Sequence, residues 1–460
     1  MLLAWSATPH IYRSMRFCCQ DPKNVLDISA IASTIQPLQQ FAQSKEVSLY
    51  LVGGSVRDLL LARPATDLDF ALAENAIMIA QDFARTIDAT CIQLETDPPT
   101  ARIISGRSTP PQIYDLAQFR GQDLEADLRL RDLTINAMAY NLDRQNLIDP
   151  CGGQQDLAAK ILRFPARQVV VDDPLRMLRL FRFAAQLEFQ IDPASLSLVS
   201  QLSDTLLLSA TERIRDEFLK MMTVNQSVPI LEIMQNIGLL QQILKTDFEV
   251  AKKKISFFEQ QPVPDQLDQY LQQAEGLSVE DYLTHEVVTG LSRSTLIKLS
   301  LLSPAEDWKR LLLGRKAEQL LSNWKLGFQQ FPSLDQDPTP LLRTLRCEWI
   351  GVITQYFATV QAEAEREAST SITDFEQIAL SIGVCYYEKV LPILKRGSLL
   401  TGKSLIQIFR ISEGPQIGRI LTYLDHLQFA GLIRTQDEAC QAVSKYLSQQ
   451  SSIQNGNRDQ

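Results

Sequence analysis

Short apolar runs that end in glycine, proline or polar residues recur along the first 165 residues of the chain. Runs of this length and composition predict β-strands, here at 47–52, 68–71, 91–94, 101–105 and 112–116. After the second of these runs, residues 74–87 place apolar side chains at helical spacing and predict an amphipathic helix. We expect this part of the chain to form a mixed sheet with helices.

The pattern changes at about Asp173. Beyond it, strand-like runs almost disappear, and amphipathic helical patterns follow one another to about residue 450. The predicted fold class is α+β, with a compact head followed by an elongated all-α region. The expected parts and linkers are a head at 1–165, a neck at 166–230, a body at 231–375, a tail at 376–460, and linkers at 260–265 and 331–340.

The composition is that of an ordinary globular protein. Of 460 residues, 45% are hydrophobic and 22% are charged, which is enough apolar material for several cores. The 45 basic and 54 acidic residues leave a formal charge of −9. A uniformly basic coat for nucleic acid is therefore excluded, but a local basic groove is not. The 3 histidines lie far apart in the sequence, which argues against a His-rich metal cluster.

Cysteine usage and hydropathy predict a cytoplasmic protein. The 7 cysteines are odd in number and form no C-x-x-C pair, which favours a reducing compartment over a disulfide framework. Residues 1–20 lack the apolar run of a secretory signal. No stretch is long and apolar enough to span a bilayer, so we expect no membrane partner.

Two glycines follow the first predicted strand. The sequence LVGGSVRD at 51–58 places Gly53 and Gly54 between a strand and a helix, where backbone N–H groups can approach phosphate oxygens. A plain tight turn is the alternative. Asp67 and Asp69 stand two residues apart at the start of the next strand, so their carboxylates project to one face. Adjacent like charges favour a cation, and carboxylate oxygens suit Mg²⁺. The combination predicts metal-dependent nucleotidyl transfer.

The sequence LVGGSVRDLLLARPATDLDF at 51–70 resembles the signature of DNA polymerase β-type nucleotidyltransferases. Within them it resembles the bacterial-type (class II) tRNA nucleotidyltransferases and poly(A) polymerases. Further motifs of that family recur in order: RDLTINA at 131–137, DPCGGQQDL at 149–157, DDPLR at 172–176 and ERIRDE at 212–217. The resemblance implies a polymerase-β-like head with a helical neck, body and tRNA-binding tail. It also implies addition of C, as CC or as full CCA, to tRNA 3′ ends with release of pyrophosphate.

The resemblance assigns roles to individual residues. Asp67 and Asp69 are the implied catalytic ligands of Mg²⁺, and Asp115, in DLAQFR at 115–120, is a candidate third catalytic carboxylate. The implied nucleotide-binding residues are Gly53, Gly54, Arg57, Arg131, Asp132, Asn136, Asp173, Arg176, Arg179 and Arg182. Two positions depart from the family pattern: Leu130 replaces the first Arg of R-R-D, and Asp172 replaces a Glu.

Asp173 and Arg176 can select a base by hydrogen bonding. Three residues apart on a predicted helix, they are expected to share one face. The Arg can donate to O2 and N3 of cytosine while the Asp accepts from N4, and adenine also fits the pair. Uracil presents N3–H to the Arg and O4 to the Asp, so both contacts become repulsive. An ordinary i,i+3 salt bridge is the alternative.

Five arginines fall between residues 163 and 182, at positions 163, 167, 176, 179 and 182. Such a local basic strip on an acidic protein fits a polyphosphate and an RNA 3′ end. A solvated helix face is the alternative.

The segment between DLAQFR and RDLTINA is short. Full CCA-adding members of the family carry a flexible loop of a few dozen residues here, associated with the switch from C to A addition. Only residues 121–130 intervene in this chain, and we expect them to form little more than a tight connection. The chain therefore resembles the CC-adding subgroup. It also lacks the His-Asp pair of a phosphohydrolase domain that one family variant appends.

Two alternative functions stay open. A poly(A) polymerase has nearly the same head motifs, and an inactive RNA-binding homologue would keep the fold. Intact Asp67 and Asp69 argue against the second alternative. The expected partners are a tRNA 3′ end with CTP and/or ATP, and no protein partner is inferred.

Overall fold

The computed structural model describes residues 26–456, except 66, 107–110, 277, 304, 332–336 and 365–371. The segment 1–20 and part of the predicted linker at 331–340 lie outside these residues. The chain divides into two compact units, one of residues 1–172 with 190–195 and one of residues 173–189 with 196–460. The chain therefore passes between the units three times. The finer division into head, neck, body and tail stays a prediction.

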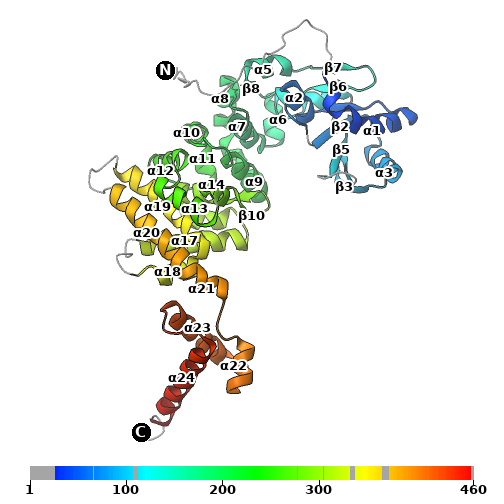
Figure 1. The fold of residues 1–460 in the computed structure, drawn as a ribbon. Helices are drawn as coiled ribbons and strands as arrows, with labels where there is room; N and C mark the ends of the chain where they lie inside the picture. Colours follow the sequence, from blue (N-terminus) through cyan, green and yellow to red (C-terminus); the bar gives the residue numbers. More distant parts are fainter. Residues whose placement is uncertain are drawn as a thin grey trace. The chain divides into compact units, whose positions relative to one another are not determined.

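The first unit contains a mixed sheet. Its strands run in the order β3-β4-β5-β2-β1-β6-β7, and β2 and β5 are the parallel neighbours (Figure 1). The bounds are β1 Tyr50–Val52, β2 Asp67–Leu72, β3 Thr90–Thr96, β4 Pro99–Ser105, β5 Gln112–Gln118, β6 Ala139–Asn141 and β7 Asn146–Ile148. All five predicted strands are confirmed. β1 begins later than predicted because the amide of Val47 donates back to Ala42 at the end of helix α1 (Ala32–Ser44).

Apolar side chains cover one face of this sheet. Phe70 of β2 lies beside Tyr114 of β5, with ring centroids 6.4 Å apart. Tyr114 also meets Phe83 of helix α3 (Ala76–Thr86) edge-on at 5.8 Å and donates its hydroxyl proton to the carbonyl of Thr34 in α1 at 3.1 Å. Helix α3 confirms the helix predicted at 74–87. Side chains alternate between the faces of a strand, so Asp67 and Asp69 project from the opposite face.

Helix α4 (Leu124–Arg129) packs on that opposite face. Its Leu124 and Leu128 join a buried cluster with Val52, Ala71 and Ala139 of three adjacent strands. Ala71 is two residues beyond Asp69 and shares its face. The expectation of a bare tight connection at 121–130 is therefore wrong, because apolar residues at i and i+4 suffice to anchor a short helix.

Further short elements complete the first unit: α2 Gly54–Leu60, η2 Thr134–Asn136, α5 Gly153–Ala159, β8 Ile161–Leu162, α6 Arg167–Asp172 and β9 Gln190–Ile191. β8 and β9 form a parallel pair, although the chain visits the second unit between them. The amide of Phe164 donates to Ser195 Oγ at 3.2 Å, and Arg163 lies 3.5 Å from Asp192. Residues 190–195 are thus an integral part of the first unit.

The second unit is almost entirely helical within the described residues, as predicted. Its elements up to residue 302 are α7 Arg176–Leu187, most of α8 Pro193–Leu202, which begins in the first unit, η3 Ser203–Leu208, α9 Thr211–Met222, α10 Val228–Asn236, α11 Leu239–Ile243, α12 Phe248–Gln260, α13 Asp265–Glu275, α14 Val279–Thr284, β10 Glu286–Val288, β11 Leu291–Ser292 and α15 Arg293–Leu302. The elements that follow are α16 Ala305–Arg310, α17 Arg315–Gln330, α18 Thr339–Leu345, η5 Arg346–Glu348, α19 Trp349–Ala364, α20 Ile372–Cys385, η6 Tyr386–Val390, α21 Leu391–Arg396, α22 Gly402–Phe409, α23 Pro415–Phe429 and α24 Gln436–Gly456. The predicted linker at 260–265 is the turn between α12 and α13.

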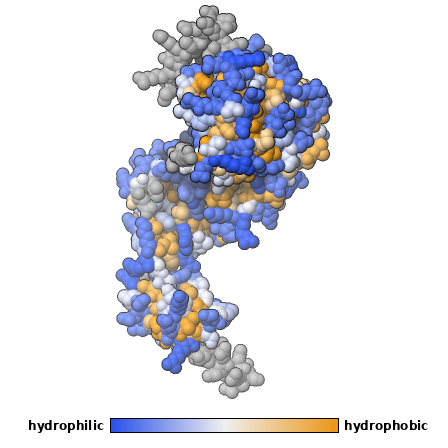
Figure 2. Space-filling model, turned by 90° about the vertical axis from the view of Figure 1, so that its right-hand side faces the viewer, coloured by the Kyte–Doolittle hydropathy of each residue, from blue (hydrophilic) through white to orange (hydrophobic). Residues whose placement is uncertain are grey.

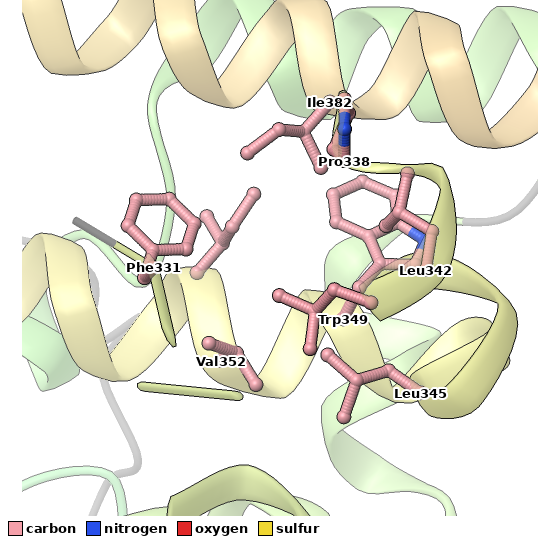
Figure 3. Close-up of a pocket in the computed structure, with 9 residues that line it drawn as sticks. Phe331, Pro338, Leu342, Leu345, Trp349, Val352 and Ile382 are labelled. Atoms are coloured by element: carbon pink, nitrogen blue, oxygen red, sulfur yellow. The ribbon is translucent and has the colours of Figure 1, made fainter. Parts of the chain in front are cut away.

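The core of the helical unit is closely packed around two tryptophans. A Cβ built on Gly351 would lie 2.5 Å from the indole of Trp324, so only glycine lets α17 and α19 approach this closely. Beside Trp349 a cavity of about 10 Å³ remains. Figure 3 shows the side chains around it, among them Phe331, Leu342, Leu345, Val352 and Ile382. The lining is apolar except for the indole N–H of Trp349, which is buried and makes no hydrogen bond to the described residues, so the cavity offers a water fewer polar partners than it needs.

The face shown in Figure 2 is mostly polar, and the described cysteines form no disulfide. Hydrophobic residues lie on that face in scattered patches. None of the described helices combines the length and apolarity needed to cross a bilayer. Among the described residues, the cysteines are unpaired thiols at positions 91, 151, 347, 385 and 440.

Candidate active site

Three predicted carboxylates lie on one face of the sheet. Asp67 and Asp69 stand two residues apart on β2 and so share one face, and Asp69 is the register partner of Asp115 on the parallel strand β5. Burial and the negative charge of Asp115 raise the pKa of Asp69 to about 6, with a smaller contribution from Asp67. Arg131 and Arg102 oppose this rise. The site therefore carries more negative charge than its neighbours compensate, and a cation would relieve it.

The donor set suits a divalent cation that also binds substrate. Within the described residues, no three His, Cys, Asp or Glu side chains converge to form a metal site by themselves. Two aspartates that leave several positions open are typical of Mg²⁺ sites completed by water and phosphate oxygens. Asp67 and Asp69 fit this arrangement.

Asp115 is already paired. Both of its carboxylate oxygens accept from Arg102 on the neighbouring strand β4, at 2.8 Å from Nε and 2.7 Å from Nη2. Such a two-point contact is among the stronger ion pairs in proteins. The sequence reasoning missed Arg102, because an isolated arginine in a strand gives no signal of its partner.

The glycine turn lies directly beside Asp69. Gly53 has φ 70°, a left-handed conformation that favours glycine, and a Cβ there would lie 3.1 Å from Arg131 Nη1 and 3.7 Å from Asp69 Oδ2. Ser55, in the first turn of α2, accepts a hydrogen bond from the Asp69 amide at 3.0 Å and donates to the Asp67 carbonyl at 2.9 Å. Ser55 thus fixes β2 against the turn. Sequence reasoning did not single it out.

Three of the predicted nucleotide-binding side chains form one buried network. Arg57 Nη1 donates to Asn136 Oδ1 at 2.8 Å, while Asn136 Nδ2 donates to Asp132 Oδ1 at 3.1 Å. Arg57 also donates from Nε and Nη2 to the carboxylate of Asp58, at 2.9 Å each. These contacts join the helix after the glycine turn to the RDLTINA segment.

Helix α5 packs against the RDLTINA segment. A Cβ on Gly153 would lie 2.3 Å from the carbonyl oxygen of Thr134, so glycine is required for this contact. Asp156 accepts a hydrogen bond from Thr134 Oγ1 at 2.7 Å and lies 3.2 Å from Arg163 Nε. The motif DPCGGQQDL at 149–157 identified this turn from the sequence. Its contact with Thr134 could not be predicted, because the two segments are too far apart in the sequence for a local pattern.

In the second unit, the prediction that Asp173 and Arg176 share a helix face is wrong. Helix α6 ends at Asp172 and α7 begins at Arg176, so Asp173 lies in the turn between them. The cause is Pro174, whose ring disfavours the helical conformation in the preceding residue. The Asp173 carbonyl accepts from the Arg176 amide at 3.0 Å, while its carboxylate pairs with Arg213 of α9 at 3.0 Å.

The remaining predicted arginines face α9. Arg182 Nε lies 2.6 Å from Glu217 Oε2, and Arg179 Nη1 lies 3.7 Å from Glu217 Oε1. Arg182 also stacks on Phe183, with its guanidinium carbon 4.1 Å from the ring centroid. Glu217 of the ERIRDE motif therefore pairs with two of the α7 arginines, Arg179 and Arg182.

Comparison with known proteins identifies the family of this chain. A family described as the poly(A) polymerase head domain matches residues 49–163, and one described as a probable RNA- and SrmB-binding site of polymerase A matches residues 188–246. A CC-adding tRNA nucleotidyltransferase of Geobacter sulfurreducens is 30% identical over 412 residues, which cover 86% of this chain and 91% of the relative. The chain belongs to the tRNA nucleotidyltransferase and poly(A) polymerase family. The family resemblance drawn from the motifs is confirmed.

Other members of the family agree. A CC-adding tRNA nucleotidyltransferase of a Synechocystis strain is 40% identical over 170 residues, 36% of this chain and 40% of the relative. The structure of the Thermotoga maritima CCA-adding enzyme with tRNA is 22% identical, with a TM-score of 0.59 over 91% of this chain and 96% of that one. This similarity confirms the fold class. Polymerase-β-like nucleotidyltransferases typically use divalent metals, in accord with the carboxylates of β2.

Proposed function

We propose that this chain transfers CMP from CTP to the 3′ end of tRNA, releases pyrophosphate, and stops after two additions. The observation that carries the proposal is the position of Asp67 and Asp69 on one sheet face, with Asp69 directly beside the Gly53 turn and Arg131. The Geobacter sulfurreducens relative, which matches along 91% of its length, is a CC-adding tRNA nucleotidyltransferase, and this supports the same activity. The cysteine usage supports a cytoplasmic location.

Each part of the site has a role in this reaction. Asp67 and Asp69 hold Mg²⁺, which when bound neutralises triphosphate charge and favours ionisation of the attacking 3′-hydroxyl. The 3′ oxygen bonds to the α-phosphorus, the bond from that phosphorus to the pyrophosphate oxygen breaks, and the hydroxyl proton passes to water. Arg131 faces the triphosphate across the Gly53 turn, where the lack of a side chain leaves room. The Arg57–Asn136–Asp132 network orients the ribose side of the nucleotide.

The substrate test uses tRNA that lacks its 3′ CCA, an unrelated RNA of equal length, and CTP or ATP. We expect CTP to extend the tRNA by two nucleotides, ATP alone to extend neither RNA, and the unrelated RNA to stay unextended. A poly(A) polymerase would instead build long tracts from ATP on both RNAs. Absence of any extension with every nucleotide would support an inactive RNA-binding homologue.

We assign base choice to Asp173 and Arg176 although they do not share a helix face, because the turn at Pro174 keeps them adjacent, with the Arg176 amide 3.0 Å from the Asp173 carbonyl. In this assignment the Asp173 carboxylate, which pairs with Arg213, accepts from N4 of cytosine when the nucleotide is bound.

Replacing Arg176 with Ala should lower CTP use and reduce the CTP:UTP selectivity about tenfold, because one repulsive buried contact with uracil is lost. Asp173→Ala should act in the same direction. The measurement is kcat/KM for both nucleotides. Lys252→Ala serves as the control, because Lys252 lies in an exposed charge cluster with Glu232 and Glu249. Unchanged selectivity in both variants would place base selection elsewhere.

A further inference from the structure

The connection at 121–130 contains helix α4, which packs closely on the rest of the first unit. Asp123 caps helix α4 by accepting from the Ala126 amide at 2.8 Å. Gly121 packs so closely on this helix that a Cβ there would lie 2.5 Å from Ala126 Cβ. Leu124 and Leu128 anchor the helix in the cluster on the face that carries Asp69. The connection therefore has a defined position relative to the carboxylates.

One buried carboxylate joins the two ends of this connection. Asp127 is 3% exposed, and its Oδ1 accepts from the Arg120 amide at 3.0 Å, just before the connection begins. Its Oδ2 accepts from Nε and Nη2 of Arg131, just after the connection ends, at 3.1 and 3.0 Å. Arg131 Nη1 is thereby left to face the Gly53 turn.

This arrangement is unlike a contact that serves stability alone. A buried ion pair is costly to desolvate, and apolar residues often stabilise such a position as well or better. By holding Nε and Nη2, however, Asp127 fixes the plane of a guanidinium group and so directs the remaining nitrogen. Among the described residues, Arg131 Nη1 makes no hydrogen bond, and it lies beside the turn where Gly53 leaves room.

We propose that Asp127 is a positioning residue that aims Arg131 at the triphosphate of the incoming nucleotide, and that it makes the connection a rigid part of the nucleotide site. The proposal rests on the proposed function. It assigns the connection a task in binding CTP, in addition to joining β5 to the RDLTINA segment.

The test is a double-mutant cycle of Asp127→Asn, Arg131→Ala and the combined variant in the full chain, measured as KM and kcat for CTP on tRNA. Asp127→Asn should raise KM about tenfold and change kcat less than about threefold, the pattern expected when a binding contact of ground and transition state is weakened. The combined variant should be no worse than Arg131→Ala, because Asp127 acts through Arg131. Asp82→Asn is the matched control, since Asp82 pairs with Arg85 on the exposed side of α3.

The proposal would be overturned by an unchanged KM for CTP in Asp127→Asn or by additive effects in the combined variant. Asp127→Glu covers the case in which Asp127→Asn does not fold. It keeps the charge but displaces it, so it should raise KM by a smaller factor, and an unchanged KM would also refute the positioning role. Activity of the unmodified chain is measured first, so failure of the proposed function is recognised separately. If that activity is absent, the same cycle is measured as CTP binding by calorimetry.

Discussion

Replacing either Asp67 or Asp69 with Asn or Ala should lower CMP incorporation by about 100-fold or more, because each variant removes one of the two carboxylates proposed to hold Mg²⁺. Both aspartates lie on the face of β2 that adjoins the glycine turn. Affinity for tRNA should change only a few-fold, since neither residue is part of the basic strip. The measurement is single-turnover incorporation of labelled CMP at saturating enzyme. Residual activity above about one per cent in either variant would refute the assignment.

Asp69→Asn should raise the stability of the metal-free protein, although it lowers activity. The pKa of Asp69 is raised to about 6 by burial and by Asp115, so the folded state binds a proton more tightly than the unfolded state does. Without metal, stability therefore falls as pH rises from about 4 to about 6, and the whole penalty, about 2–3 kcal/mol, is present above that window.

Asp69→Asn removes the ionisable group and should raise the Tm of the metal-free protein at pH 7.5 while abolishing activity. It should also flatten the dependence of Tm on pH between about 4 and 6. Asp82→Asn, which alters an exposed ion pair, should leave both quantities nearly unchanged. A fall in Tm for Asp69→Asn at neutral pH would show that the carboxylate stabilises the metal-free fold instead.

Synthesis should stop after the second C. The pocket must reorient to accept the larger purine, and in the family a long flexible loop is associated with that switch. In this chain the corresponding segment is the α4 connection, which is anchored by Leu124 and Leu128 and joined at both ends by Asp127. Because it has no free length to act as a lever, we expect A addition to be about 100-fold slower than either C addition.

The measurement is a time course of CTP plus ATP on three tRNA substrates that end before, after one, and after two C residues. The tRNA ending in CC should accumulate. The control is the tRNA lacking one C, which must be extended by CTP at the full rate to show that the preparation is active. Comparable rates for all three steps would show that the enzyme completes CCA and reorients its pocket in another way.

Local sequence patterns correctly predicted the strand and the turn that position the candidate site. Strand β2, its two aspartates and the glycine turn lie within twenty residues of one another, so periodicity and turn chemistry were enough to place them. The same patterns predicted α3 and the change to helices near residue 173. Asp173 was misplaced because the helical spacing outweighed a local signal, the proline that follows it.

The partners of these residues could not be predicted. Arg102 pairs with Asp115 on the neighbouring strand, and Gly153 of helix α5 contacts Thr134. Such contacts depend on strand order and helix packing, which a single sequence does not encode in its periodicity. Asp127 was overlooked for a related reason: in the sequence it is one acidic residue among several, and only its burial distinguishes it.

The return of residues 190–195 to the first unit constrains how the chain can be made. When residue 172 leaves the ribosome, β8 still lacks its parallel partner β9, the Phe164 amide lacks Ser195, and Arg163 lacks Asp192. The first unit therefore cannot complete its folding until α7 has also been synthesised and residue 195 has emerged. Nascent chains arrested between these two points should still be open to protease near β8, and a gene fragment that ends at 172 encodes an incomplete unit.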